Sequence, residues 1–212
     1  MPKSVPDPDA DVTYELRIQL ADITPPIWRT FIVPGYIGLD DLNYVVQIVM
    51  GWTNSHLHEF GKGARRFAPP NPEADDYGPK VFDEADFILE DLLKRPNQSL
   101  SYLYDLGDGW SHLITLKAIR PKRCTAPKVL AGERACPPED CGGSWGYAEK
   151  LKAWADPEHE EHQEILDWLP EGYDPEVYPM AEVNKLSRRA LRLRLRRAAV
   201  IRDGCGRGMA YG

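Results

Sequence analysis

Two strand-like segments joined by a very short turn constrain the fold of this chain more than any other feature. Ser99–Leu106 and Trp110–Ile119 read as strong strands, and only Gly107-Asp108-Gly109 separates them. A connection of this length joins neighbouring antiparallel strands. The sequence therefore predicts an antiparallel hairpin over residues 99–119.

The first fifty residues predict two further strands and one helix. Apolar and polar side chains alternate over Val12–Leu20, and a second strand is expected at Ile27–Val33, after the break at Pro25-Pro26. Leu39–Met50 repeats its apolar residues at three- and four-residue steps, which predicts a helix, with Gly51 as its C-cap.

The middle of the chain carries weaker signals. We expect a short strand at His56–Gly61, a proline-rich surface loop at Arg65–Lys80, and a strand at Ala85–Leu89 that leads into a helical turn at Glu90–Lys94. Arg120–Gly143 is rich in proline, glycine and cysteine and is expected to form an ordered but irregular crossover.

Helical patterns follow, at Ser144–Trp154, Pro157–Leu169 and Met180–Arg189, whereas Leu191–Leu195 alternates like a strand. Strands thus come first and helices last. The expected fold is α+β, with a largely antiparallel sheet, one early helix and a helical C-terminal third.

The expected organisation is a disordered lead-in at residues 1–11, a single domain at 12–186 and a basic tail at 187–212. Residues 1–11 lack the apolar centre of a signal peptide, and no apolar stretch approaches the ~20 residues that cross a bilayer. With 4 cysteines and no export signal, the expectation is a cytoplasmic protein with reduced thiols and no membrane contact.

Charge is divided unevenly along the chain. From Lys185 onward nine basic residues face Asp203 alone, whereas the preceding 184 residues carry 17 basic and 32 acidic groups. An acidic body repels phosphate, so nucleic acid is a possible partner only for residues 187–212. The alternative for this tail is a solvated terminal segment.

Two histidines, His56 and His58, stand two residues apart on an expected strand. Side chains at this spacing project from the same face, so both could hold one ion or one acidic ligand. The alternative is a pair of half-buried histidines with ordinary hydrogen bonds.

The predicted hairpin gathers Tyr104, Asp105, Asp108, Trp110 and His112 around its turn. Carboxylate with imidazole is the material of metal sites and of acid–base pairs. Aspartate beside glycine is also ordinary turn chemistry, and for Asp108 that interpretation is favoured. His112 is expected inside a strand, where turn chemistry does not explain it.

A cysteine loop follows, with Cys136 and Cys141 flanking Glu139 and Asp140, and with Cys124 upstream. Thiolates can bind zinc, although the Cys136–Cys141 spacing is wider than in most structural zinc sites. The alternative is a rigid loop with buried thiols. The candidate metal ligands are His112, Cys124, Cys136 and Cys141, with zinc as the possible cofactor. The candidate ligand-binding pocket comprises His56, His58, Tyr104, Asp105, Asp108, Trp110, His112, Glu139 and Asp140.

Taken together, these segments resemble the plasmid pRiA4b ORF-3-like family over about Tyr14 to Leu186. The Cys-Pro-Pro-Glu-Asp-Cys-Gly-Gly run at residues 136–143 is the most distinctive element. The other matching segments are Pro25–Arg29, Gly51-Trp52, Ser55–His58, Tyr104–His112, Gly132–Ala135 and Gly146-Tyr147. Leu106 departs from the pattern, since an aromatic residue is expected there.

The resemblance implies an α+β fold and a family found on plasmids, in mobile elements and in chromosomes, without an established activity. Some members are labelled transposon passenger or resolvase-like proteins, but no resolvase serine with supporting arginines is identifiable here. The sequence also has no phosphate loop, dinucleotide fingerprint, HExxH or GxSxG motif.

No nucleophile with its base can be assembled, so the leading interpretation is a non-catalytic binding or regulatory module, associated with mobile elements, for a small ligand or protein. It depends on the three polar segments meeting in one pocket. A metal-dependent hydrolase using a His/Asp/Cys pocket is the first alternative. Nucleic-acid binding through the arginine-rich tail is the second.

Overall fold

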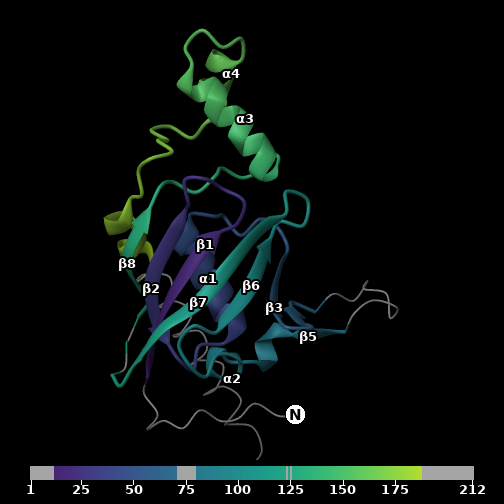
Figure 1. Ribbon diagram of the computed structural model, residues 1–212, viewed down its shortest axis with the longest axis vertical. Helices are drawn as coiled ribbons and strands as arrows, with labels where there is room; N and C mark the ends of the chain where they lie inside the picture. Colours follow the sequence, from purple (N-terminus) through teal and green to yellow (C-terminus); the bar gives the residue numbers. More distant parts are fainter. Residues whose placement is uncertain (1–11, 71–79, 123, 125, 188–212) are drawn as a thin grey trace, which may run out of the picture.

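The centre of the molecule is a mixed sheet of eight strands (Figure 1), seen in a computed structural model that describes residues 12–70, 80–122, 124 and 126–187. The strand order is β5-β4-β3-β6-β7-β1-β2-β8. Neighbouring strands are antiparallel except for the parallel pair β4–β5. The strands are β1 (Thr13–Leu20), β2 (Trp28–Pro34), β3 (His58–Lys62), β4 (Arg65–Ala68), β5 (Val81–Asp83), β6 (Ser99–Tyr104), β7 (Trp110–Arg120) and β8 (Lys128–Glu133).

Alternation in the sequence decides which face of the sheet is buried. Along β1, Tyr14, Leu16, Ile18 and Leu20 are all at most 3% exposed. Successive side chains on a strand point to opposite faces, so these four enter the core while the residues between them face outward. The central strand β1 pairs with both β2 and β7 and thereby fixes this register over the middle of the sheet.

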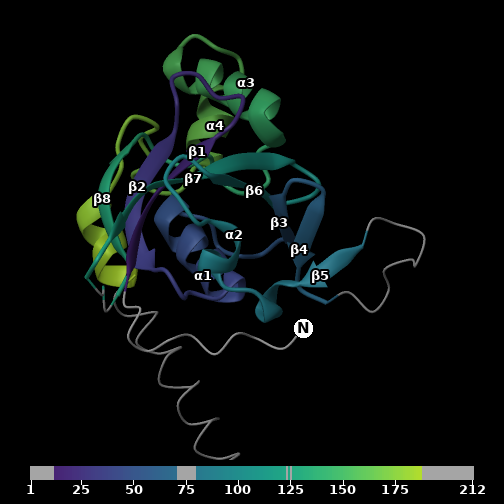
Figure 2. The ribbon, with the colours of Figure 1, turned by 60° about the horizontal axis from the view of Figure 1, so that its bottom comes forward.

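Helix α1 (Leu39–Met50) covers the inner face, and the sheet curves around it (Figure 2). Its apolar stripe, including Leu42, Val46 and Val49, is fully buried against the strands. The helix ends at Gly51, which adopts the left-handed conformation with φ 109°. Glycine takes this conformation without the steric cost that a Cβ atom imposes.

The remaining helices lie towards the edges of the sheet. A 3-10 turn, η1 (Glu84–Asp86), and α2 (Leu89–Leu92) follow β5, and a helix begins at Met180. Helices α3 (Gly143–Ala155) and α4 (His162–Trp168) form a separate pair beyond one end of the sheet (Figure 1). In the described part of the chain, no helix is long and apolar enough to span a membrane.

The structure confirms the hairpin, the early helix and the mixed, mostly antiparallel architecture. The expectation for Arg65–Lys80 is wrong in part, because β4 pairs there with β3 and buries Phe67. The crossover at Arg120–Gly143 likewise contains the edge strand β8. Strand β4 has only four residues, and β8 is held at the sheet edge by the remote strand β2.

Two local predictions are also wrong. Ala85–Leu89 is not a strand, because the Asp83 carboxylate accepts a hydrogen bond from the Ala85 amide and starts the turn η1. The helix expected from Pro157 begins at His162 as α4, because the residues before it close separate turns on Asp156 and His159.

Part of the predicted organisation lies outside the described residues, namely the lead-in at 1–11, the strand at Leu191–Leu195 and nearly all of the tail at 187–212. The helical C-terminal third as a whole stays a prediction, as does the single domain at 12–186.

Candidate functional site

The segment after α1 is held in place by two polar residues of that helix. Gln47 accepts a hydrogen bond from the Asn54 amide through its side-chain oxygen (2.9 Å), and Asn43 donates to the Asn54 side chain (3.1 Å). Both helix residues also bind the buried hydroxyl of Tyr102, each at 2.7 Å. This anchoring holds the segment that carries His56, two residues after Asn54.

The β6–β7 hairpin contributes Asp105, whose two oxygens have different environments. Oδ1 accepts hydrogen bonds from the amides of Gly107 (2.9 Å) and Asp108 (3.3 Å) and so shapes the turn. Oδ2 lies 3.7 Å from Nε2 of His56. The side chain is only 9% exposed, so its position is set by the fold.

The loop after β8 contributes Glu139 and Asp140. Glu139 Oε1 accepts three hydrogen bonds, from the amide of Thr53 (2.7 Å), its hydroxyl (2.9 Å) and the hydroxyl of Tyr104 (3.0 Å). Burial raises the pKa of Tyr104, so its hydroxyl keeps the proton that it donates. The Ser55 amide in turn donates to Tyr104 (3.1 Å).

Asp108 ties this loop to the hairpin rather than joining the cluster around His56. Its Oδ2 accepts a hydrogen bond from the Gly142 amide (3.1 Å). A Cβ atom on the next residue, Gly143, would lie 2.5 Å from the Asp108 carbonyl oxygen, so only glycine permits this close approach. The interpretation of Asp108 as a structural turn residue agrees with these contacts.

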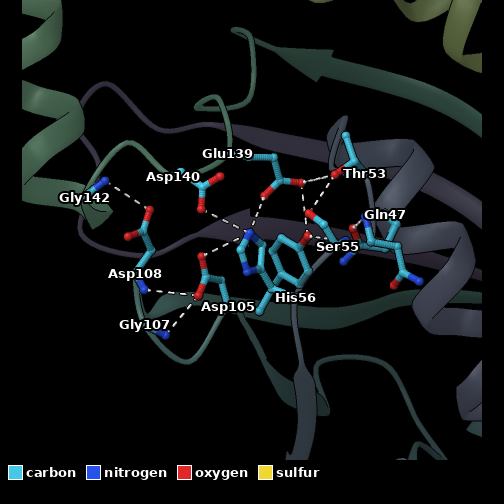
Figure 3. A network of polar contacts seen from close by, with 12 residues as sticks. Gln47, Thr53, Ser55, His56, Asp105, Gly107, Asp108, Glu139, Asp140 and Gly142 are labelled. Carbon is cyan, nitrogen blue, oxygen red and sulfur yellow. Dashed lines mark hydrogen bonds and ion pairs between the residues drawn. The ribbon is translucent and has the colours of Figure 1, made fainter.

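Three carboxylates thus surround one imidazole (Figure 3). Nε2 of His56 lies 3.3 Å from Asp140 Oδ1, 3.7 Å from Asp105 Oδ2 and 3.9 Å from Glu139 Oε2. Neither His56 Nε2 nor Glu139 Oε2 has a hydrogen-bond partner, although both atoms are buried. The Asp140 side chain is 75% exposed and opens one side of the cluster to solvent. Three acids against one base give the cluster a net negative charge even when the imidazole is protonated.

His58 lies apart from this cluster, so the prediction that it shares a ligand with His56 is wrong. The strand begins only at His58, and His56 belongs to the preceding irregular segment. His58 is buried and its Nε2 is 2.8 Å from Oε2 of Glu84, in the turn η1. The rule that side chains two residues apart on a strand project from the same face therefore does not apply to His56 and His58.

His112 and Trp110 are core residues behind the site. The Nδ1 atom of His112 contacts the carbonyl oxygens of Trp110 (2.9 Å) and Tyr102 (3.3 Å). Complete burial lowers the pKa of His112 to about 4, so the ring is neutral at ordinary pH. Trp110 packs against Trp52 with ring centroids 5.5 Å apart. Both residues support the site and neither reaches the carboxylate cluster.

The candidate zinc set of His112, Cys124, Cys136 and Cys141 is not gathered in the structure. In the described part of the chain, the group whose ligand atoms lie together is His56, Asp105 and Asp140. Cys136 and Cys141 are free thiols. Burial raises the pKa of Cys136 and brings that of Cys141 to about 12, so in the metal-free protein both are thiols at neutral pH.

Sequence reasoning missed the supporting residues Asn43, Gln47, Thr53 and Glu84. One signal was present. Asn43 and Gln47 stand four residues apart beside the buried stripe of α1, where buried amides need hydrogen-bond partners. Thr53 and Glu84 gave no comparable signal, because their partners come from distant segments.

Fold and site together define an α+β protein with a curved, mostly antiparallel sheet and an acidic, histidine-centred cluster beside one hairpin. The chain belongs to the plasmid pRiA4b ORF-3-like family, which it matches over residues 12–182.

Two relatives place the chain among proteins without a known activity. The uncharacterised protein y4hQ of Sinorhizobium fredii (strain NBRC 101917 / NGR234) is 40% identical over 172 residues, which cover 80% of this chain and 88% of the relative. A crystal structure of the protein of unknown function MM3350 from Methanosarcina mazei Go1 has a TM-score of 0.73 at 32% identity. That match covers 81% of this chain and 97% of the other.

Proposed function

We propose that the protein is a non-catalytic binding module that takes a cationic ligand at the cluster formed by His56, Asp105, Glu139 and Asp140. The observation that carries this proposal is the convergence of three carboxylates from two remote segments on one imidazole nitrogen, at 3.3–3.9 Å. A cluster with excess negative charge, closed on several sides by protein and open at Asp140, favours a positively charged ligand.

Preorganisation supports the same conclusion. One oxygen of Asp105 and one of Glu139 are fixed by hydrogen bonds to the surrounding chain, and the other oxygen of each faces His56. A site whose polar groups are already oriented pays less conformational entropy when its ligand binds. The ligand oxygens of Asp105 and Asp140 lie within 4.8 Å of each other, and like charges this close are costly without a counter-charge, so a cation stabilises the arrangement.

Calorimetric titration with three cations of different kind, Zn²⁺, Mg²⁺ and spermidine, tests this function. At least one should bind the wild-type chain with a stoichiometry near one. The double variant Asp105→Asn, Asp140→Asn removes two charges while keeping the side-chain shapes, so its affinity should fall at least about 10-fold. The matched control is Asp22→Asn, at an exposed turn position, which should bind like wild type. Absence of binding, or equal binding to the double variant, would overturn the proposal.

A metal-dependent hydrolase is the second candidate, and the exposed Asp140 side chain favours it because a water molecule can reach the cluster. It would draw on His56, Asp105, Glu139 and Asp140 instead of His58, His112 or the cysteines. Ester and phosphoester hydrolysis assayed on wild type and on His56→Ala separates the two, since a binding module shows no difference between them.

We further propose a cytoplasmic protein with a single domain over residues 12–186. Cys136 and Cys141 are free thiols, in keeping with a reducing compartment. A link to mobile elements rests on the plasmid origin in the family's name. Nucleic-acid binding by residues 187–212 stays an alternative, whose test is salt-dependent binding that is lost when these residues are deleted.

A further inference from the structure

We propose that the cation is a single divalent metal ion of the first transition row, held by Nε2 of His56, Oδ2 of Asp105 and Oδ1 of Asp140. Oε2 of Glu139 lies beside this set, 3.9 Å from Nε2 of His56. This inference rests on the proposed cation-binding function and names the ligand class.

The spacing of the donor atoms separates a metal ion from an organic cation. A metal about 2.1 Å from each of four tetrahedral ligands keeps those ligands about 3.4 Å apart. An ammonium group that donates hydrogen bonds of about 2.8 Å would keep its four acceptors about 4.6 Å apart. Asp140 Oδ1 and Asp105 Oδ2, at 3.3 and 3.7 Å from Nε2 of His56, are clearly nearer the first value, whereas Glu139 Oε2, at 3.9 Å, lies between the two.

Unsatisfied atoms at the centre of the cluster are the second observation. Nε2 of His56 and Oε2 of Glu139 are both buried, and neither has a hydrogen-bond partner. Buried polar atoms are nearly always satisfied in folded proteins, and an ion is one of the few groups that satisfies both at once. The distance of 3.9 Å between the two atoms is too long for a direct hydrogen bond and short enough for one shared ion.

The hydrogen bonds behind the carboxylates are of the kind that hold metal ligands in place. Asp105 and Glu139 each use one carboxylate oxygen to bind the protein. Asp105 accepts hydrogen bonds from two turn amides, and Glu139 accepts them from Thr53 and Tyr104. The remaining oxygen of each is thereby turned towards His56. Outer partners of this kind orient metal ligands and raise metal affinity.

The mixture of donors indicates the kind of metal. One imidazole with carboxylates suits Zn²⁺, Fe²⁺ or Mn²⁺, whereas Mg²⁺ prefers an all-oxygen octahedron with several waters. Zn²⁺ should therefore bind more tightly than Mg²⁺. The exposed side of the cluster at Asp140 leaves room for a solvent molecule in a further coordination position.

Equilibrium dialysis of the full chain against Zn²⁺, with bound metal measured by elemental analysis, tests the inference. Wild type should retain one ion per chain in the presence of a large excess of Mg²⁺. His56→Ala and Asp105→Asn should each weaken Zn²⁺ binding more than about 10-fold. Asn at position 105 still has the oxygen that accepts hydrogen bonds from the turn amides, so this variant should keep the hairpin. It therefore tests the site even if His56→Ala fails to fold.

Two control variants distinguish this site from other zinc-binding groups. His159→Ala, in the turn between α3 and α4, and Cys141→Ser should both bind Zn²⁺ like wild type. If the chain binds spermidine but not Zn²⁺, the metal assignment is overturned and the cation-binding function stays in place. If the chain binds neither Zn²⁺ nor spermidine, the cation-binding function is overturned as well. Zinc retained unchanged by His56→Ala and Asp105→Asn, or lost in Cys141→Ser, would also contradict the assignment.

Discussion

At the scale of single residues, the buried imidazole of His112 should make the stability of the protein depend on pH. Its pKa in the folded state is about 4, because burial disfavours the charged ring. An unfolded histidine has a pKa of about 6.5, so between these values the unfolded chain binds a proton that the folded chain does not. The free energy of unfolding should fall by up to about 3 kcal/mol as the pH drops from about 6.5 to about 4.

Urea denaturation at a series of pH values measures this effect. The variant His112→Phe removes the titrating group. Its free energy of unfolding should therefore fall less than that of wild type over the same pH interval, whatever its value at pH 7. An equal loss in both proteins would show that His112 does not stay neutral in the fold.

Residue types and their neighbourhood in the sequence were enough to single out His56, Asp105, Glu139 and Asp140, but not to separate them from His58 and His112. The difference depends on where β3 begins and on Glu84, which binds His58. Both are set by tertiary contacts between segments far apart in the chain. Spacing rules assign side chains to faces only once an element's bounds are known.

At the scale of elements, α1 ends at Gly51, and substitutions at this residue test whether its left-handed conformation is needed. Gly51 has φ 109°, and a Cβ atom there would make only an ordinary contact, 3.6 Å from Cβ of Cys136. The cost of Gly51→Ala is therefore conformational and should be about 1–2 kcal/mol of unfolding free energy. Gly51→Asn should cost less, since asparagine tolerates the left-handed conformation. Equal stability of Gly51→Ala and wild type in urea denaturation would contradict this account.

Elements with a strong local pattern were predicted from the sequence with nearly the observed bounds. These are β1, α1 and the β6–β7 hairpin, whose apolar spacing alone specifies the buried face. The strands β4 and β8 and the turn η1 were not, because their conformations are decided by pairing with β3 and β2 and by a single side-chain cap at Asp83.

At the scale of the whole molecule, the fold brings together three segments that are remote in the sequence. The segment after α1 supplies His56, the β6–β7 hairpin supplies Asp105, and the loop before α3 supplies Glu139 and Asp140 (Figure 3). A ligand that binds all three should stabilise the folded state over the unfolded one, in which the segments are apart. Saturation with Zn²⁺ at 100 times its dissociation constant should add about 2.7 kcal/mol to the free energy of unfolding.

The position of a bound ion is the most direct test of the central claim. Crystals of the full chain grown with Zn²⁺ allow the metal to be located by its anomalous scattering. The account predicts one strong peak about 2 Å from Nε2 of His56, between the carboxylates of Asp105 and Asp140. Peaks found only at cysteines or at His159 and His162, with none beside His56, would contradict it.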